Sequence, residues 1–432
     1  MIKTLNRTLA MATLGSLCLL SPALLHAATP SKGEIEQLKQ QVQQLMQQNQ
    51  QLNQRLTEME KKGLQTRPAA PDQKIAEEEK ARHQSMIEQE VARQVKEKGS
   101  GPGINEFVSL SGSIEGDYKL GKDFQGDHSS EFVLDTVDLI FDIKVTDWAT
   151  GKVVVEYDGT EDNEDLYIDE AHITLGKTEE VPFFLTGGKI YAPFGDFSTN
   201  MIQDPLTQTL GEINSEGVIA GAEKNGFTAT VFSYNGMGEN SDPADDDNDT
   251  INGFGASLAY SYEQEDRGFK VGGAWVNNLA DAGTNTDYLE DGGIYSVSDQ
   301  VPGLAFFLGG NYKGFSLQTE YVTALDSFDV TEIPYGFDEA AVGAEPAAWN
   351  SELAYTTAIM DKETVFAIGY QKSWESVALE LPEHRYIASA AVNIFDGTTL
   401  ALEFFHDEDY SAGDGGTDNS GHGFTTRLAY EF

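Results

Sequence analysis

Cysteine is almost absent from this sequence of 432 residues, and the single one is Cys18. It lies in an N-terminal segment that we expect to be removed, so the mature chain would have no disulfide, no thiolate metal ligand and no cysteine nucleophile. Basic residues are also scarce: 28 Lys and Arg against 71 Asp and Glu give a formal net charge of −43. Nucleic-acid binding depends on clustered Lys and Arg that neutralise phosphates, so the charge argues against a nucleic-acid partner.

Long apolar runs are missing as well. The run from Leu9 to Leu20 follows Lys3 and Arg7 and precedes small residues, a pattern that predicts a signal peptide over residues 1–27. Beyond it no run of about 18 apolar residues remains that could cross a bilayer as a helix. An exported chain of this kind would enter a membrane as a closed β-barrel, because only helices and closed sheets satisfy every backbone polar group in lipid.

The C-terminal residues alternate between two faces of a strand. One face carries Phe424, Thr426, Leu428, Tyr430 and Phe432, and the other carries Thr425, Arg427, Ala429 and Glu431. Period two is typical of a strand with a different solvent on each side. The segment resembles the closing strand of an outer-membrane barrel, and this resemblance implies that Leu428, Tyr430 and Phe432 are the signal read by the barrel-assembly machinery. The alternative is an edge strand of a soluble sandwich.

Strand-like patterns fill the rest of the chain. The sixteen segments are 107–119, 132–146, 151–158, 165–176, 182–191, 216–224, 226–235, 251–263, 267–278, 301–313, 314–325, 349–360, 363–374, 384–396, 397–407 and 421–432. Connections after even-numbered segments are short, as at Asn225–Gly226, whereas most of the others are long and rich in Asp and Gly, as at 279–300. Short connections at one end and long connections at the other are typical of an outer-membrane barrel with both termini in the periplasm. We predict an all-β transmembrane fold, a 16-stranded antiparallel β-barrel over residues 104–432.

A short α-helical coiled coil is expected before the barrel, over residues 34–62. Its seam repeats at spacings of three and four: Ile35, Leu38, Val42, Leu45, Asn49, Leu52, Leu56 and Met59. The polar residue at one seam position favours self-association, as a trimer or alternatively a dimer. The other interpretation is a Gln-rich disordered tether. Residues 63–103 read as a charged helical spacer with a Gly/Pro linker, which would place the whole helical region in the periplasm.

The strand faces predict a wet interior. Leu402 and Phe404 would face outward with Glu403 inward, and Tyr321 outward with Glu320 inward. Because sixteen strands make a barrel wide enough for an aqueous channel, the pattern indicates a pore.

The third long connection, 192–215, differs from the other loops in carrying many apolar residues, which would not lie in water. We expect it to fold into the barrel and narrow the lumen; the alternative is that it caps the barrel mouth. Charge at a constriction sets ion preference. The predicted constriction consists of Asp196, Asp204 and Glu212 on the loop opposite Lys189, Arg385 and Arg427 on the wall.

The same region resembles a known family. Gly187-Gly-Lys-Ile-Tyr-Ala-Pro-Phe-Gly-Asp-Phe197, with Asp204-Pro205, Thr209-Leu-Gly-Glu212 and Asn225-Gly-Phe227, is similar to legiobactin-receptor-like (LbtU-type) siderophore porins of the Gram-negative outer membrane. Members have a signal peptide, a short coiled coil and a predicted sixteen-stranded barrel. The resemblance therefore implies uptake of an iron siderophore without a plug domain.

Other chemistry finds little support. The acidic run 242–249 could offer carboxylates to Ca²⁺, but Thr250 stands where a calcium loop has its glycine. The histidines His83, His128, His172, His384, His406 and His422 are scattered without ligand spacing. No G-x-S-x-G motif is present. We expect neither an enzyme, nor a metal site, nor a cofactor.

The predicted function is passive, TonB-independent uptake of a small polar solute, most specifically an iron siderophore, through an outer-membrane porin. Alternatives are a general cation-leaning diffusion porin, or a structural barrel that anchors a periplasmic coiled coil. The expected partners are outer-membrane lipid and lipopolysaccharide, the barrel-assembly machinery, the solute and further copies of the chain.

Overall fold

The computed structural model describes residues 107–432 apart from 160–165, 240–249, 265 and 338–339. The described residues all belong to one compact unit, Gly101–Phe432. The predicted signal peptide, coiled coil, charged spacer and acidic run 242–249 lie outside the described residues and stay predictions.

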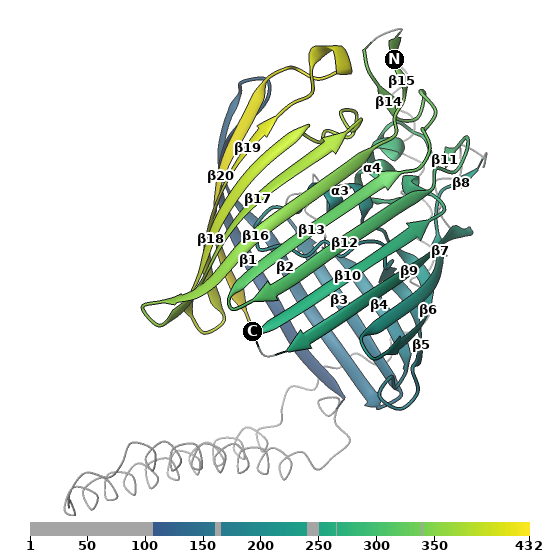
Figure 1. Ribbon diagram of the computed structural model, residues 1–432, viewed down its shortest axis with the longest axis vertical. Helices are drawn as coiled ribbons and strands as arrows, with labels where there is room; N and C mark the ends of the chain where they lie inside the picture. Colours follow the sequence, from purple (N-terminus) through teal and green to yellow (C-terminus); the bar gives the residue numbers. More distant parts are fainter. Residues whose placement is uncertain (1–106, 160–165, 240–249, 265, 338–339) are drawn as a thin grey trace, which may run out of the picture. The chain divides into compact units, whose positions relative to one another are not determined.

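Sixteen antiparallel strands close into a barrel (Figure 1). They are β1 (Val108–Lys122), β2 (His128–Thr146), β3 (Ala149–Asp158), β4 (Leu166–Gly176), β5 (Phe183–Tyr191), β6 (Asn214–Lys224), β7 (Phe227–Asn235), β9 (Ile251–Gln264), β10 (Arg267–Val276), β12 (Gly303–Tyr312), β13 (Phe315–Ala324), β16 (Ala347–Ile359), β17 (Lys362–Trp374), β18 (His384–Phe395), β19 (Thr398–Glu408) and β20 (Ser420–Glu431). Strands pair in chain order, and β20 closes onto β1 with Ile114 opposite Tyr430. The predicted fold is confirmed.

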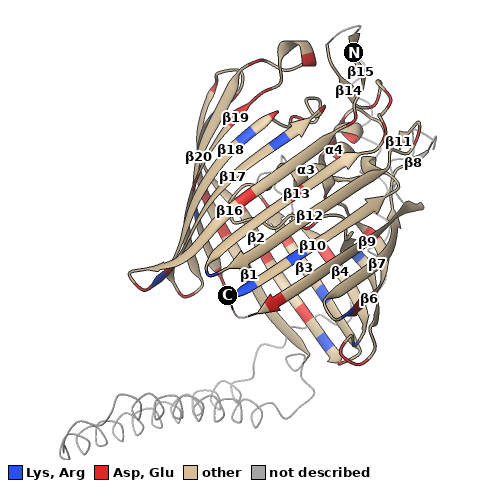
Figure 2. Cartoon of the chain, viewed as in Figure 1, with Lys and Arg blue, Asp and Glu red and all other residues tan. Residues whose placement is uncertain are grey.

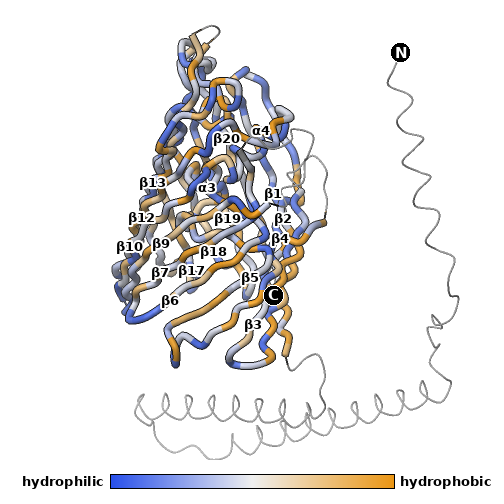
Figure 3. The backbone as a smooth tube through the Cα atoms, turned by 90° about the vertical axis from the view of Figure 1, so that its right-hand side faces the viewer, coloured by the Kyte–Doolittle hydropathy of each residue, from blue (hydrophilic) through white to orange (hydrophobic). Residues whose placement is uncertain are grey.

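The strands form because apolar and polar residues alternate along them (Figure 3). Outward residues are large and apolar, as with Phe404, whose side chain is 49% exposed, whereas the next inward residue, Glu403, is 1% exposed. The same alternation separates outward Tyr321 from buried Glu320 on β13. The predicted faces of these strands are therefore confirmed, and the apolar outer face matches the surface that a membrane barrel presents to lipid.

Tight turns join the strands at one end of the barrel. Asn225 and Gly226 both have positive φ, 54° and 83°, and Lys313 and Gly314 have 49° and 85°. Two consecutive residues with positive φ match the right-handed twist of a hairpin. A third such turn lies at Met360–Asp361, one residue before the predicted position.

The long connections carry short elements of their own. These are α3 (Leu206–Gly211), η2 (Leu279–Asp281), α4 (Gly283–Asp291), η4 (Ala412–Asp414) and the two-residue strands β8 (Gly238–Glu239), β11 (Ser296–Val297), β14 (Pro334–Tyr335) and β15 (Val342–Gly343). Among the described residues, no helix is both long enough and apolar enough to cross a membrane.

The main apolar cluster lies inside the barrel. It joins Leu210 of α3 and Leu289 of α4 to the inward-facing wall residues Phe232, Val276 and Val322, all nearly or fully buried. Burying these side chains holds two connections, 192–213 and 277–302, against the inner wall between β7 and β16. This packing fills one side of the interior.

Candidate functional site

Residues 192–213, here called the inward loop, leave β5 and cross the barrel interior before returning to β6. The loop starts with a backbone hydrogen bond from Ala192 N–H to Ile213 O, 2.9 Å. Phe194 is fully buried in the apolar cluster. The sequence-based expectation of a loop folded against the inner wall agrees with these contacts.

Three glutamates of the far wall hold the inward loop in place. Glu320 of β13 accepts hydrogen bonds from the N–H groups of Asp196 (2.7 Å) and Phe197 (3.1 Å). Glu352 of β16 accepts from the N–H of Asn200 at 3.0 Å. Glu403 of β19 accepts from the N–H groups of Ile202 at 2.5 Å and Gln203 at 3.1 Å. A carboxylate that receives backbone N–H groups makes strong, charge-assisted bonds. The glutamates therefore hold successive parts of one loop along five neighbouring wall strands, β13, β16, β17, β18 and β19.

Helix α3 joins the returning half of the loop to residues 277–302, here called the fifth connection. The N–H of Gly283 donates to Glu212 O at 2.8 Å, and the Asn285 amide, which is fully buried, donates to Leu210 O at 3.1 Å. The N–H of Leu206 donates to the side chain of Gln371 on β17. Backbone groups at both ends of the helix thus find partners outside it, which makes α3 and α4 one rigid insert.

The tip of the inward loop leaves an open gap on the opposite side of the interior. This gap is a cavity of about 550 Å³ between the tip and strands β1, β2, β3, β18, β19 and β20. Its charged lining residues are Asp117, Lys119, Glu131, Asp135, Glu156, Asp158, Asp204, Arg385 and Arg427. Carboxylates outnumber cations in this set, and Figure 2 places charges of both signs on the barrel strands.

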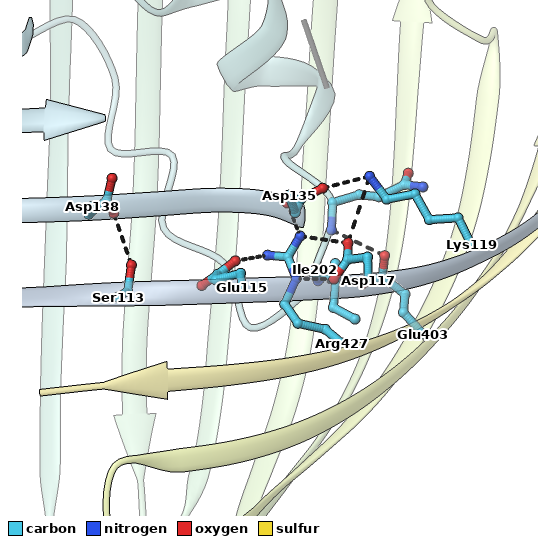
Figure 4. A network of polar contacts seen from close by, with 10 residues as sticks. Ser113, Glu115, Asp117, Lys119, Asp135, Asp138, Ile202, Glu403 and Arg427 are labelled. Carbon is cyan, nitrogen blue, oxygen red and sulfur yellow. Dashed lines mark hydrogen bonds and ion pairs between the residues drawn. The ribbon is translucent and has the colours of Figure 1, made fainter. Parts of the chain in front are cut away.

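Arg427 of β20 lies at the centre of a charge network beside this gap (Figure 4). Its guanidinium makes two bonds to Asp117 of β1, at 2.8 and 2.9 Å, and further ion pairs to Glu115 and Asp135. Lys119 adds a second cation, 2.6 Å from Asp135. The network couples the last strand to the first two, and its carboxylates outnumber its cations.

Two β-bulges turn acidic side chains toward these sites. In β2 the partner of Gly116 is Leu134 and the partner of Glu115 is Thr136, so Asp135 is the extra residue. Leu134 is 48% exposed outside, while Asp135 is 7% exposed and bonds Arg427. In β4 the extra residue is Asp169, which accepts a hydrogen bond from the Tyr191 hydroxyl at 2.6 Å. A bulge re-aims a side chain, which strict alternation does not reveal.

Three of the six predicted constriction residues meet at the gap. Asp204 at the loop tip lines it together with Arg385 and Arg427. Arg385 also forms a two-bond pair with Asp407 of β19, 2.9 Å for each bond. Burial within the barrel raises the pKa of the Asp204 carboxyl above its ordinary value, and the Arg427 charge opposes the rise.

Glu212 and Lys189 line a separate cavity of about 380 Å³ between strands β5 and β6 and the fifth connection. Burial raises the pKa of Glu212 to about 7, with a further contribution from the negative charge of Asp204. The Lys189 ammonium donates to Ile168 O at 2.8 Å. This pair therefore lies apart from the gap at the loop tip.

Asp196, the remaining predicted residue, forms an ion pair with Lys270 of β10. Both line a third cavity of about 270 Å³ on the hairpin side of the loop, together with Glu263 and Gln318. The structure thus distributes the predicted set over three places along the interior. Leu428, Tyr430 and Phe432, the predicted assembly signal, are all about half exposed, and their role stays a prediction.

Sequence reasoning missed the anchoring role of Glu320, Glu352 and Glu403. It placed Glu320 and Glu403 in a wet lumen, whereas they are buried beneath the inward loop. One signal was available: inward-facing glutamates recur on β13, β16 and β19, and a loop with many apolar residues needs partners for its backbone groups. No comparable sequence pattern identifies Lys270 as the partner of Asp196, or Asp135 as a partner of Arg427.

Comparisons with known proteins give distant relatives. No family model matches the chain. A UPF0422 protein of Coxiella burnetii is 27% identical over 312 residues, which cover 70% of this chain and 65% of that protein. A UPF0422 protein of Legionella pneumophila (strain Lens) is 23% identical over 329 residues, which cover 70% of this chain and 59% of that protein. The chain thus matches less than two thirds of the length of these relatives.

Solved structures establish the fold. OprB of Pseudomonas putida has a TM-score of 0.53 at 8% identity, covering 76% of this chain and 95% of that one. The outer membrane channel DcaP of Acinetobacter baumannii has a TM-score of 0.50 at 16% identity, covering 75% and 97%. An anion-selective porin from Comamonas acidovorans has 0.50 at 12%, covering 75% and 99%. The chain has the barrel fold of outer-membrane porins.

Proposed function

We propose that this protein is a passive outer-membrane channel for small polar solutes, with a lumen narrowed by the inward loop. The observation that carries the proposal is the pinning of that loop across the interior by Glu320, Glu352 and Glu403. A barrel that served only as an anchor has no need of a loop held in this way. The open gap beside the loop tip provides the path.

The lining charges support a preference for cations. Arg427 is already surrounded by Glu115, Asp117 and Asp135, and Arg385 is paired with Asp407, so the basic groups at the gap are neutralised locally. The remaining carboxylates set the potential in a narrow, poorly screened space. The fold alone does not decide the sign, since an anion-selective porin shares it.

An iron siderophore is the most specific solute that we propose, taken up without energy coupling through TonB. Support for it comes from the sequence resemblance to legiobactin-receptor-like porins. Among the described residues, the barrel interior is occupied by connections 192–213 and 277–302 of the barrel itself. The polar, acidic lining suits a hydrated solute with cationic or hydroxyl groups.

We further propose that the functional unit is a homo-oligomer, a trimer or alternatively a dimer. The region before residue 104 would lie in the periplasm and contribute the seam from Ile35 to Met59. Analytical ultracentrifugation of the full chain and of a chain lacking residues 34–62 tests this directly. The same number of copies per assembly in both proteins would show that the seam is not needed for oligomerisation.

Planar-bilayer recording of the purified full-length protein tests the channel. We expect stepwise conductance with a reversal potential, in a KCl gradient, that indicates cation preference. A protein that inserts without conducting would refute the channel and favour the anchor. Iron-siderophore uptake by a deletion strain tests the solute separately: conductance together with unchanged uptake would leave a general diffusion porin.

A further inference from the structure

Histidines that are scattered in the sequence meet on the outer face of the barrel. His406 of β19 pairs in register with His422 of β20, His422 pairs with Lys122 of β1, and Lys122 pairs with His128 of β2. These four residues, here called the basic row, lie side by side across four neighbouring strands. On its other side His406 is paired with Tyr386 of β18, with ring centroids 6.5 Å apart.

The basic row faces outward and not into the lumen. Each of three row residues is preceded or followed, two positions away on the same strand face, by an exposed apolar residue. These are Phe404 beside His406 (49% exposed), Phe424 beside His422 (37%) and Leu120 beside Lys122 (39%). These three are also mutual partners: Phe404 pairs with Phe424, and Leu120 pairs with Phe424. The row therefore borders the apolar outer surface at the end of the barrel where the long connections lie.

The charge of the row is not cancelled by its register partners. In the described strands the four residues pair only with one another and with Tyr386. Asp407, next to His406 in sequence, is buried on the opposite strand face and forms an ion pair with Arg385. The other nearby carboxylates are Glu408, Asp123 and Asp127. Glu408 pairs with His384 and Ser420, while Asp123 and Asp127 cap their own turn, the N–H of Asp127 donating to Asp123 Oδ1 at 2.8 Å. The four residues take part in no ion pair within the described part of the chain.

We propose that the basic row is a docking site for a membrane lipid with a phosphate-monoester headgroup. The inference rests on the membrane placement proposed above. An ammonium carries three N–H donors and each imidazole at least one, and phosphate oxygens are strong acceptors. The acyl chains would lie on Leu120, Phe404 and Phe424, and the Tyr386 ring would lie at the boundary where tyrosine is favoured. Charge and apolar surface thus match the two halves of one amphiphile.

Native mass spectrometry of the full-length protein in detergent tests the site. The probes are phosphatidic acid and phosphatidylcholine with identical acyl chains. We expect the wild type to retain phosphatidic acid about tenfold better, since a charge-assisted hydrogen bond contributes roughly that factor. The triple variant Lys122→Gln/His406→Gln/His422→Gln should lose the preference, whereas Lys224→Gln, a basic residue on the outward face at the hairpin end, should keep it.

Conductance of the same preparations separates the possible failures. Normal channel steps in the triple variant, with its lipid preference lost, would support the site. Wild-type channels without any lipid preference, or an unchanged preference in the triple variant, would overturn it and leave the proposed function standing. A change of oligomeric mass in the triple variant would overturn it as well, because the row would then be a contact between copies. A wild type that does not conduct refutes the proposed function instead.

Discussion

The carboxylate of Glu352 on β16 holds Asn200 of the inward loop by both its backbone and its side chain. The Asn200 N–H lies 3.0 Å and its amide nitrogen 2.6 Å from Glu352 Oε1, and the two residues are 152 positions apart in sequence. Thr199 adds a hydroxyl hydrogen bond to the other carboxylate oxygen at 2.6 Å. One buried wall residue thus fixes two consecutive residues of the loop.

Replacing this carboxylate should loosen the loop. We expect Glu352→Gln to lower the free energy of unfolding by about 1–3 kcal/mol, the cost of leaving buried N–H donors without a charged acceptor. Single-channel recordings should show larger and noisier steps than the wild type. The matched control is Glu263→Gln, an inward glutamate of β9 that bonds Asn311 and not the loop. Identical recordings from both variants would contradict the pinning role of Glu352.

The loop tip should contribute to ion selectivity. Asp204 lines the gap, and Asp204→Asn removes one negative charge there without a change of size. We expect a smaller cation preference, measured as a shift of the reversal potential toward zero in a KCl gradient. Asp147→Asn at the exposed turn before β3 is the control, because screening over a Debye length of about 10 Å hides that charge from the gap. Equal shifts of the reversal potential in the two variants would show that Asp204 is not part of the constriction.

Selectivity should also depend on pH through Glu212, which lies outside the gap but close enough to Asp204 for the two carboxyl charges to interact. Its pKa is raised to about 7 by burial and by Asp204, so most copies of the carboxyl are charged at pH 8 and most are neutral at pH 6. Cation preference is therefore expected to decrease when the pH falls from 8 to 6. Glu212→Gln should show the low preference at both values. A pH dependence that survives in this variant would assign the titration to another group.

Arg427 should be essential for stability because it compensates three acids. Arg427→Gln leaves Glu115, Asp117 and Asp135 close together with Lys119 as the remaining cation of the network. Removing one partner of a buried ion pair costs about 3–5 kcal/mol, so the temperature of heat-induced unfolding should drop clearly. Lys152→Gln, which breaks a single pair with Glu170, is the control. Comparable losses in the two variants would show that the network is not cooperative.

The sequence was sufficient to predict the strands and their order. Alternation along β13 and β19, together with turn residues such as Asn225–Gly226, depends on neighbours that are close in sequence, so local patterns reveal it. The inward position of the third loop could also be predicted, since its apolar residues have no place in water. These features depend on short-range chemistry.

The details of the site depend on long-range register and could not be predicted. Asp135 and Asp169 reach their partners through bulges, each of which inserts one residue and reverses the alternation beyond it. The division of Asp196, Asp204 and Glu212 among three cavities follows from the positions at which the wall glutamates bind the loop. Those positions are set by strand pairings more than a hundred residues away.

The Arg427 network favours the correct register between β20 and β1 when the barrel closes. Arg427 lies opposite Asp117 where β20 pairs with β1. A shift of one residue in the pairing of these strands would point the guanidinium at the apolar exterior. Glu115, Asp117 and Asp135 would then remain inside without their counter-ion. Misaligned closure would thus cost several kcal/mol on both faces at once, so the last pairing step selects its own correct alignment.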